Sequence, residues 1–114
     1  MDRIQFQRKA NPETDIFISY GRIAPFYNIC KVANIREEFN ITMEYIPDKY
    51  LLEVGTYRKY FQQLFNLYIE ELVEDVFSHL WELLEPKYLK VTIHVDDKNL
   101  TYWDVTMQKT KEKN

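Results

Sequence analysis

The chain has few residues of the kinds that do covalent chemistry, and its one cysteine is the first to consider. Cys30 is followed by Lys31 and, a few residues later, by Arg36. Nearby cations favour the thiolate form, which is the nucleophilic form of the side chain. A lone cysteine is nevertheless more often a small buried apolar residue. Residue type alone leaves both interpretations of Cys30 open.

Carboxylates are the second group of candidates. Glu37 and Glu38 directly follow Arg36, and either could donate a proton at an active site or be an ordinary loop charge. Glu70 and Glu71 begin an acidic run in a predicted helix. Such runs usually form a solvated face. A functional role for any of these acids therefore needs evidence beyond composition.

Residues suited to metal or phosphate binding are sparse. Besides Cys30, only His79 and His94 offer soft or imidazole ligands, and the three show no ligand spacing. Zinc sites need clustered cysteine and histidine, so no metal site is predicted. Only Gly21 and Gly55 are glycines, which excludes a glycine-rich phosphate-binding loop.

The composition is that of one globular domain, residues 1–114. Hydrophobic residues make up 46% of the chain and charged residues 29%. The net charge of −3 gives no basic footprint for nucleic acid. No apolar run is long enough to span a bilayer, and the first ten residues lack the apolar core of a signal peptide. With a single cysteine, these features predict a cytoplasmic location.

Four strands are predicted from alternation of apolar and polar residues. The clearest spans residues 39–45, and the others span residues 15–20, 89–95 and 100–107. The stretch 21–30 contains a proline and is predicted to be an irregular loop. The segments 1–14 and 109–114 are expected to be an N-terminal extension and a frayed tail.

Two helices are predicted between the strand pairs. Thr56 is a plausible cap for a helix ending near Asn66. A second helix from Tyr68 to Leu84 carries the best periodicity in the chain, and Pro86 stops it. Its apolar stripe consists of Ile69, Leu72, Val73, Val76, Phe77, Leu80, Trp81 and Leu84. The order ββααββ predicts an α+β domain with a four-stranded antiparallel sheet and two helices on one face. Sister subunits would then close its edges and its other face, which predicts a homo-oligomer.

Four segments in this order resemble the motifs of one enzyme family. Residues 43–53, MEYIPDKYLLE, are similar to a Tyr-Ile-Pro-Asp segment and the Glu that follows it. Residues 25–30 resemble Glu-Phe-Thr-Ser-x-Cys, residues 68–71 resemble Phe-His-Glu-Asp, and residues 84–88 resemble Leu-x-Pro-x-Tyr. Over residues 22–95 the chain thus resembles the queuosine-pathway nitrile reductases, the QueF family.

The resemblance implies a tunnelling fold, assembled into rings with active sites between subunits. It also implies a reaction in which Cys30 attacks the nitrile of 7-cyano-7-deazaguanine and forms a covalent thioimidate. Glu37 would be the general acid. Glu70, with Glu71 beside it, would bind the guanine-like edge of the base. NADPH would then reduce the thioimidate to an aminomethyl group.

The cofactor element departs from the family pattern Glu-x-Lys-x-x-Lys-x-Tyr. The matching residues are Glu53, Gly55, Arg58 and Tyr60, with Lys59 as a neighbouring cation. Glu53, Arg58, Lys59 and Tyr60 are therefore the predicted cofactor-binding residues. The loss of both lysines weakens the prediction of NADPH.

Two other positions also differ, and two alternatives stay open. Ile69 replaces a family histidine, and Lys31 replaces the proline after the cysteine. One alternative is a QueF-like amidinotransferase, in which ammonia attacks the same thioimidate on a base in tRNA without NADPH. The acidic net charge disfavours a tRNA partner. The other is a non-catalytic tunnelling-fold protein that binds a purine or only assembles.

Overall fold

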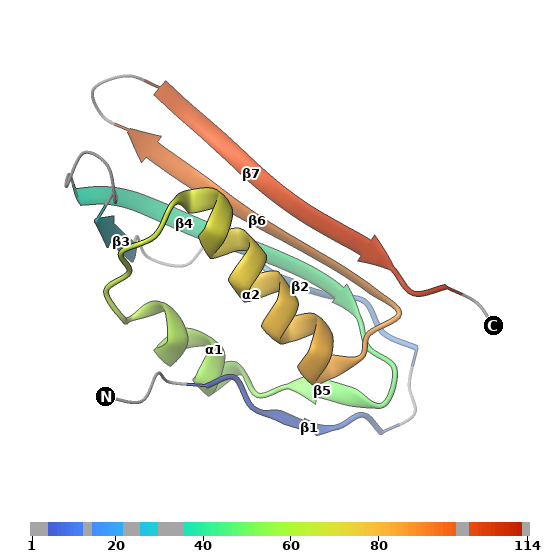
Figure 1. The fold of residues 1–114 in the computed structure, drawn as a ribbon. Helices are drawn as coiled ribbons and strands as arrows, with labels where there is room; N and C mark the ends of the chain where they lie inside the picture. The colour runs from blue at the N-terminus through green and yellow to red at the C-terminus, as the bar shows by residue number, and fades with distance from the viewer. Residues whose placement is uncertain (1–4, 13–14, 22–25, 30–35, 98–100, 113–114) are drawn as a thin grey trace.

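The structure is a computed structural model that describes residues 5–12, 15–21, 26–29, 36–97 and 101–112. It has the α+β architecture predicted from the sequence, with an antiparallel sheet and two helices on one of its sides (Figure 1). In the chain the helices follow β5 (Tyr50–Leu52) and precede β6 (Tyr88–Asp97). Within the described residues, no helix is long and apolar enough to cross a membrane.

Among the described residues the main sheet has five strands, so the predicted count of four is not confirmed. Four of them follow the order β2-β4-β6-β7, and β3 also pairs with β4. All of these pairings are antiparallel. The strands are β2 (Ile18–Tyr20), β3 (Phe26–Ile29), β4 (Arg36–Ile46), β6 (Tyr88–Asp97) and β7 (Thr101–Thr110).

The fifth strand arises because the edge strand beside β4 is interrupted. β2 and β3 both pair with the edge of β4 that β6 does not use, with Tyr20 opposite Met43 and Phe26 opposite Phe39. From Tyr20 to Phe26 is six residues (26 − 20), and from Met43 to Phe39 is four (43 − 39), so the edge carries two extra residues. The prediction of a loop over residues 21–30 is therefore wrong for residues 26–29.

A second, two-stranded sheet was not predicted. It pairs β1 (Arg8–Ala10) with β5 (Tyr50–Leu52). Two backbone bonds extend it, from Asn11 N to Lys49 O at 2.8 Å and from Glu53 N to Gln7 O at 2.8 Å. The N-terminal segment is thereby fixed to the stretch of chain that leads into the first helix.

The helices are α1 (Val54–Phe61) and α2 (Ile69–Leu84). The prediction for α2 is confirmed, and Glu85 ends it in the left-handed conformation, with φ 47°. The prediction for α1 is wrong at both ends. Its N-cap is Glu53, not Thr56, and it ends at Phe61, before Asn66. The residues after α1 bond to β3 instead of continuing the helix, as described below.

The core lies between the helices and the sheet. Phe39, Ile41, Met43 and Tyr45 of β4 are buried together with Leu89, Val91, Ile93 and Val95 of β6. The predicted stripe of α2 packs against this face, with only Trp81 half-buried. Each fully buried aliphatic or aromatic side chain contributes about 1.5–3 kcal/mol.

The opposite face of the sheet is polar. His94 of β6 bridges its neighbours there: its Nδ1 lies 2.8 Å from Asp104 Oδ1 and its Nε2 lies 2.9 Å from Thr42 Oγ1. Thr92 and Thr106 form a second cross-strand pair at 2.9 Å. An antiparallel sheet can present such a face to water or to another subunit.

Candidate functional site

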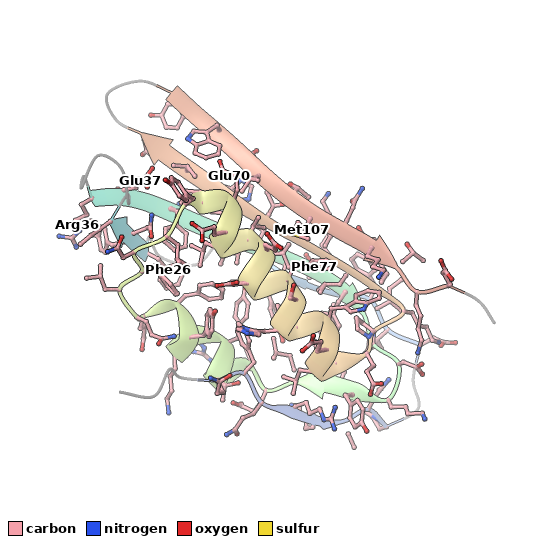
Figure 2. The ribbon with its side chains drawn as sticks, in the orientation of Figure 1. Phe26, Arg36, Glu37, Glu70, Phe77 and Met107 are labelled. Atoms are coloured by element: carbon pink, nitrogen blue, oxygen red, sulfur yellow. The ribbon has the colours of Figure 1, made fainter. Side chains whose placement is uncertain are left out.

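Two of the predicted carboxylates, Glu37 and Glu70, lie at the same end of the molecule. Figure 2 shows Glu37, at the start of β4, and Glu70, at the start of α2, at the same end, whereas Phe77 lies further along α2. β3 pairs with the start of β4, Asn28 opposite Glu37. We call this region, made by β3, the start of β4 and the start of α2, the β3–α2 end.

Asn28 is the polar centre of the β3–α2 end. Its side chain is fully buried, with 0% exposure, although asparagine is disfavoured in strands. Its Nδ2 donates to Glu37 Oε1 at 3.0 Å and to Leu67 O at 2.8 Å. Its Oδ1 accepts from Leu67 N at 3.0 Å. One amide therefore joins β3, β4 and the segment before α2.

The connection between the helices is fixed to β3 by backbone bonds as well. Ile29 N donates to Phe65 O at 2.8 Å, and Phe65 N donates to Tyr27 O at 3.4 Å. Residue 65 thus forms a parallel bridge with Asn28 on the edge of β3 that β4 does not use. This pairing explains why α1 ends at Phe61.

The position of Glu37 in β4 fixes the side of the sheet on which its side chain lies. It shares strand parity with the buried Phe39, so its half-buried side chain lies on the helix-covered side of the sheet. Glu38 has the opposite parity. The Arg36 guanidinium carbon lies 3.6 Å from the centroid of the Tyr27 ring and makes a cation–π contact with it. The geometry thus distinguishes Glu37 from Glu38; the general-acid role of Glu37 stays a prediction.

Glu70 and Glu71 differ in how their carboxylates are used. Glu71 accepts a hydrogen bond from Tyr68 N at 3.2 Å, so it caps the start of α2. Glu70 is exposed in the first turn of the helix, where the helix dipole favours a negative charge. Of the two predicted substrate-binding residues, Glu70 is the one whose carboxylate faces solvent.

Cys30, the predicted nucleophile, lies outside the described residues, as does Lys31. In the chain, Cys30 directly follows Ile29, the last residue of β3. Its role stays a prediction.

Glu53, predicted to bind a cofactor, serves as the N-cap of α1. Its Oε1 accepts from Gly55 N at 3.0 Å and its Oε2 from Thr56 N at 2.9 Å. These backbone bonds, Gly55 first, lower the pKa of Glu53. A Cβ at position 55 would lie 3.0 and 3.2 Å from the two carboxylate oxygens, so a side chain there would crowd the cap.

Tyr60, also predicted for the cofactor, is part of the core. It is 2% exposed, and its ring stacks on Phe6 with centroids 4.1 Å apart. Arg58 and Lys59 are exposed in the last turn of α1. Two of the four predicted residues are thus committed to the fold. The cofactor role of the four residues stays a prediction.

Asn28 was not singled out by the sequence analysis. The available signal was an asparagine between apolar residues in a segment that could pair as a strand. In the described parts of the chain, no three His, Cys, Asp or Glu side chains come together in a group that could hold an ion.

The fold of the chain is similar to that of a QueF-like protein. A crystal structure of the archaeosine synthase QueF-Like in its apo form superposes with a TM-score of 0.70 at 18% sequence identity. The match covers 86% of this chain and 95% of that one. The superposition shows that the two proteins share a fold, and at this identity it shows the fold alone. No protein-family model matches the chain.

Curated relatives give the particular resemblance. They are named NADPH-dependent 7-cyano-7-deazaguanine reductase. The protein of Aquifex aeolicus is 30% identical over 83 residues, which is 71% of this chain and 64% of the relative. That of Chlorobium phaeobacteroides is 30% identical over 69 residues, 59% and 58% of the two chains. That of Chlorobaculum parvum is 27% identical over 90 residues, 77% and 78%.

The chain therefore spans less than two thirds of each of the first two relatives, 64% and 58% of their lengths. The relatives and the shared fold confirm the predicted resemblance to the QueF and QueF-like family.

Proposed function

We propose that this protein is a QueF-type enzyme that acts on the nitrile carbon of 7-cyano-7-deazaguanine. The observation that carries the proposal is the convergence at the β3–α2 end. Glu37 and Glu70, chosen from separate motifs, lie at the end of the molecule where the chain runs from Ile29 into Cys30. The names of the curated relatives supply the substrate class.

The proposed chemistry begins with addition of the thiol to the nitrile. The Cys30 thiolate donates its electron pair to the nitrile carbon, forming a C–S bond. One π pair of the nitrile moves to nitrogen, which takes a proton from Glu37 and gives a neutral thioimidate. The Glu70 carboxylate accepts hydrogen bonds from the ring N–H and the exocyclic amine of the base.

Reduction of the thioimidate is the outcome that the names of the relatives support, since all are NADPH-dependent reductases. The product would be the aminomethyl base: reduced nicotinamide would supply two hydrides, two protons would be taken up, and the C–S bond would break to regenerate the Cys30 thiol. Of the predicted cofactor residues, Arg58 and Lys59 are the two exposed ones, and their charge suits phosphate groups. We assign no step to α1, because Glu53 and Tyr60 are committed to the helix cap and the core.

The use of Glu53 in the helix cap and of Tyr60 in the core favours a second candidate function, that of an amidinotransferase. In this reaction ammonia attacks the thioimidate carbon, the C–S bond breaks, and the amidine leaves with Cys30 regenerated. No reduced nicotinamide is required. The structural neighbour with the same fold is named an archaeosine synthase, which points the same way. The substrate would then be the base within tRNA.

We further propose that the protein works as a homo-oligomer with active sites between subunits. β7 has ten residues, and within the described chain it pairs only with β6. A long open edge of this kind is a template for pairing with another strand. A second copy is the proposed partner, consistent with the polar, uncovered face beside it.

The test is intact-mass spectrometry after mixing the protein with 7-cyano-7-deazaguanine, free or in tRNA. The expected result is a mass gain equal to the base, or to the modified tRNA, that is absent in Cys30→Ala. Adding NADPH or ammonia to the adduct then identifies the second reactant from the mass of the product. Absence of any adduct would reject covalent chemistry in favour of a non-catalytic binder.

A further inference from the structure

We propose that Asn28 is a positioning residue that holds Glu37 in place for proton transfer and fixes it relative to the segment that leads to Glu70. The inference rests on the proposed function for its catalytic part. Its structural part, the tie between Asn28 and Glu37, rests on geometry alone.

The orientation of the Asn28 amide follows from its contacts. Leu67 N is a donor, so the atom 3.0 Å from it must be the acceptor Oδ1. Nδ2 then faces the two acceptors Leu67 O, at 2.8 Å, and Glu37 Oε1, at 3.0 Å. Both N–H bonds of the amide are used, and the two-point contact with Leu67 prevents the amide from rotating.

This arrangement makes Glu37 dependent on a buried side chain. Glu37 is half-buried and is the second residue of β4. Asn28 lies directly across from it in the ladder, and opposite side chains in such pairs are close neighbours. The bond to Asn28 therefore restricts which way the Glu37 carboxyl can point.

The Asn28 amide is also bonded to the segment that leads to Glu70, the proposed substrate-binding residue. Leu67 immediately precedes Tyr68, the N-cap of α2, and Glu70 follows in the first turn. Phe65 is bonded to the backbone on both sides of Asn28, so the segment cannot slide along β3. The Asn28 side chain therefore joins Glu37 to the segment that leads to Glu70, in addition to the backbone bonds of Phe65.

The kinetic test is a double-mutant cycle on the rate of adduct formation at saturating base. Asn28→Ala is expected to lower this rate by about 10–100-fold in the natural background, as loss of a supporting hydrogen bond commonly does. In the Glu37→Gln background, the same change is expected to cost less than about 3-fold. The half-saturating base concentration is expected to change by less than about 3-fold in both.

Phe65→Leu is the matched control for a merely structural effect. Phe65 is buried in the same segment but packs on Phe39 and Phe61 instead of bonding to Glu37. Its penalty should be equal in both backgrounds. The proposal would be overturned if Asn28→Ala lowered the rate of adduct formation equally in both backgrounds. It would also be overturned if Asn28→Ala changed only the half-saturating base concentration.

A second measurement is independent of activity. Asn28→Asp is isosteric but faces Glu37 Oε1 and Leu67 O with an acceptor, so it should destabilise the protein to urea. Combining it with Glu37→Gln reverses the donor and acceptor, and should recover part of the loss. If the wild type forms no adduct, the proposed function fails, and this cycle still decides the Asn28–Glu37 tie. Additive losses in the cycle would reject it.

Discussion

The rings of Phe6 and Tyr60 stack with their centroids 4.1 Å apart and their planes 22° from parallel. Phe6 lies just before β1, in the segment to which the sequence assigned no role. Tyr60 lies in α1, where the resemblance predicted a cofactor residue. The contact makes Tyr60 a core side chain and makes the N-terminal segment part of the fold.

Phe6→Ala should therefore destabilise the protein substantially. Phe6 is 7% exposed and also contacts Tyr57 and Phe61, so truncation leaves a cavity in an aromatic cluster. The expected loss is about 3 kcal/mol, measured by urea denaturation. Phe17→Ala is the matched control: Phe17 is 57% exposed, and the same change there should cost under about 1 kcal/mol. Similar losses in both variants would contradict the structural role of Phe6.

Tyr45 and Tyr57 allow a matched test of how a hydrogen bond to a buried tyrosine hydroxyl affects stability. The Tyr45 hydroxyl accepts from Leu52 N at 3.0 Å. Tyr45→Phe should cost about 1–3 kcal/mol, because it leaves a buried N–H without an acceptor. The Tyr57 hydroxyl is buried and has no hydrogen-bond partner among the described residues, and its burial raises its pKa. Tyr57→Phe should therefore be neutral or stabilising, which thermal unfolding of both variants would show.

The spacing of apolar residues predicted the elements that bury a continuous apolar face. The strand around residues 39–45 and the helix α2 each place one side chain type on one face, and both were found at nearly the expected bounds. The α+β order followed from them. These elements are long, so a few atypical residues do not hide the pattern.

The short elements could not be predicted in the same way. β1, β3 and β5 have three or four residues each, too few to show alternation. β1 is exposed throughout and is held by pairing with β5, a contact of distant segments that local sequence does not encode. β3 was hidden by the proline before it and by Asn28, a residue that strands disfavour.

The candidate site was predictable only through the resemblance. Glu37 and Glu70 came from motif positions, and the structure brings both to the β3–α2 end. Nothing in the sequence separates a glutamate that caps a helix from one that binds a cofactor. Glu53 satisfies the pattern for both, and only its distances to Gly55 and Thr56 identify the cap.

The cap at Glu53 predicts a specific pH dependence. Hydrogen bonds from Gly55 N and Thr56 N lower the pKa of Glu53 in the folded protein below the ordinary 4.5. Its stabilisation is therefore present above pH 4.5 and is lost as the pH falls through the lower folded pKa. Glu53→Ala should be less stable than wild type at pH 7, with the difference shrinking on acidification. Glu74→Ala, which removes a carboxylate from an exposed helix position, is the control in the same urea denaturation series. A pH-independent deficit for Glu53→Ala would exclude the charged cap.

The open edge of β7 predicts an effect of charge on assembly. Wild-type protein should sediment as an oligomer, and Val105→Lys should shift it towards the monomer, because an inward-pointing charge blocks edge pairing. Val54→Lys makes the same change on α1, away from this edge, and should leave the mass unchanged. Circular dichroism would verify that both variants fold. A monomeric wild type would contradict the proposed assembly.

Glu70 provides the sharpest test of substrate recognition. In a Cys30→Ala background, which removes the covalent step, calorimetry can measure simple binding of 7-cyano-7-deazaguanine. Glu70→Ala should weaken it by about 10–100-fold, the cost of losing charge-assisted hydrogen bonds of roughly 1.5–3 kcal/mol. Glu74→Ala is the control, because Glu74 is exposed one turn further along the same helical face. Equal losses in both variants would contradict recognition of the base by Glu70.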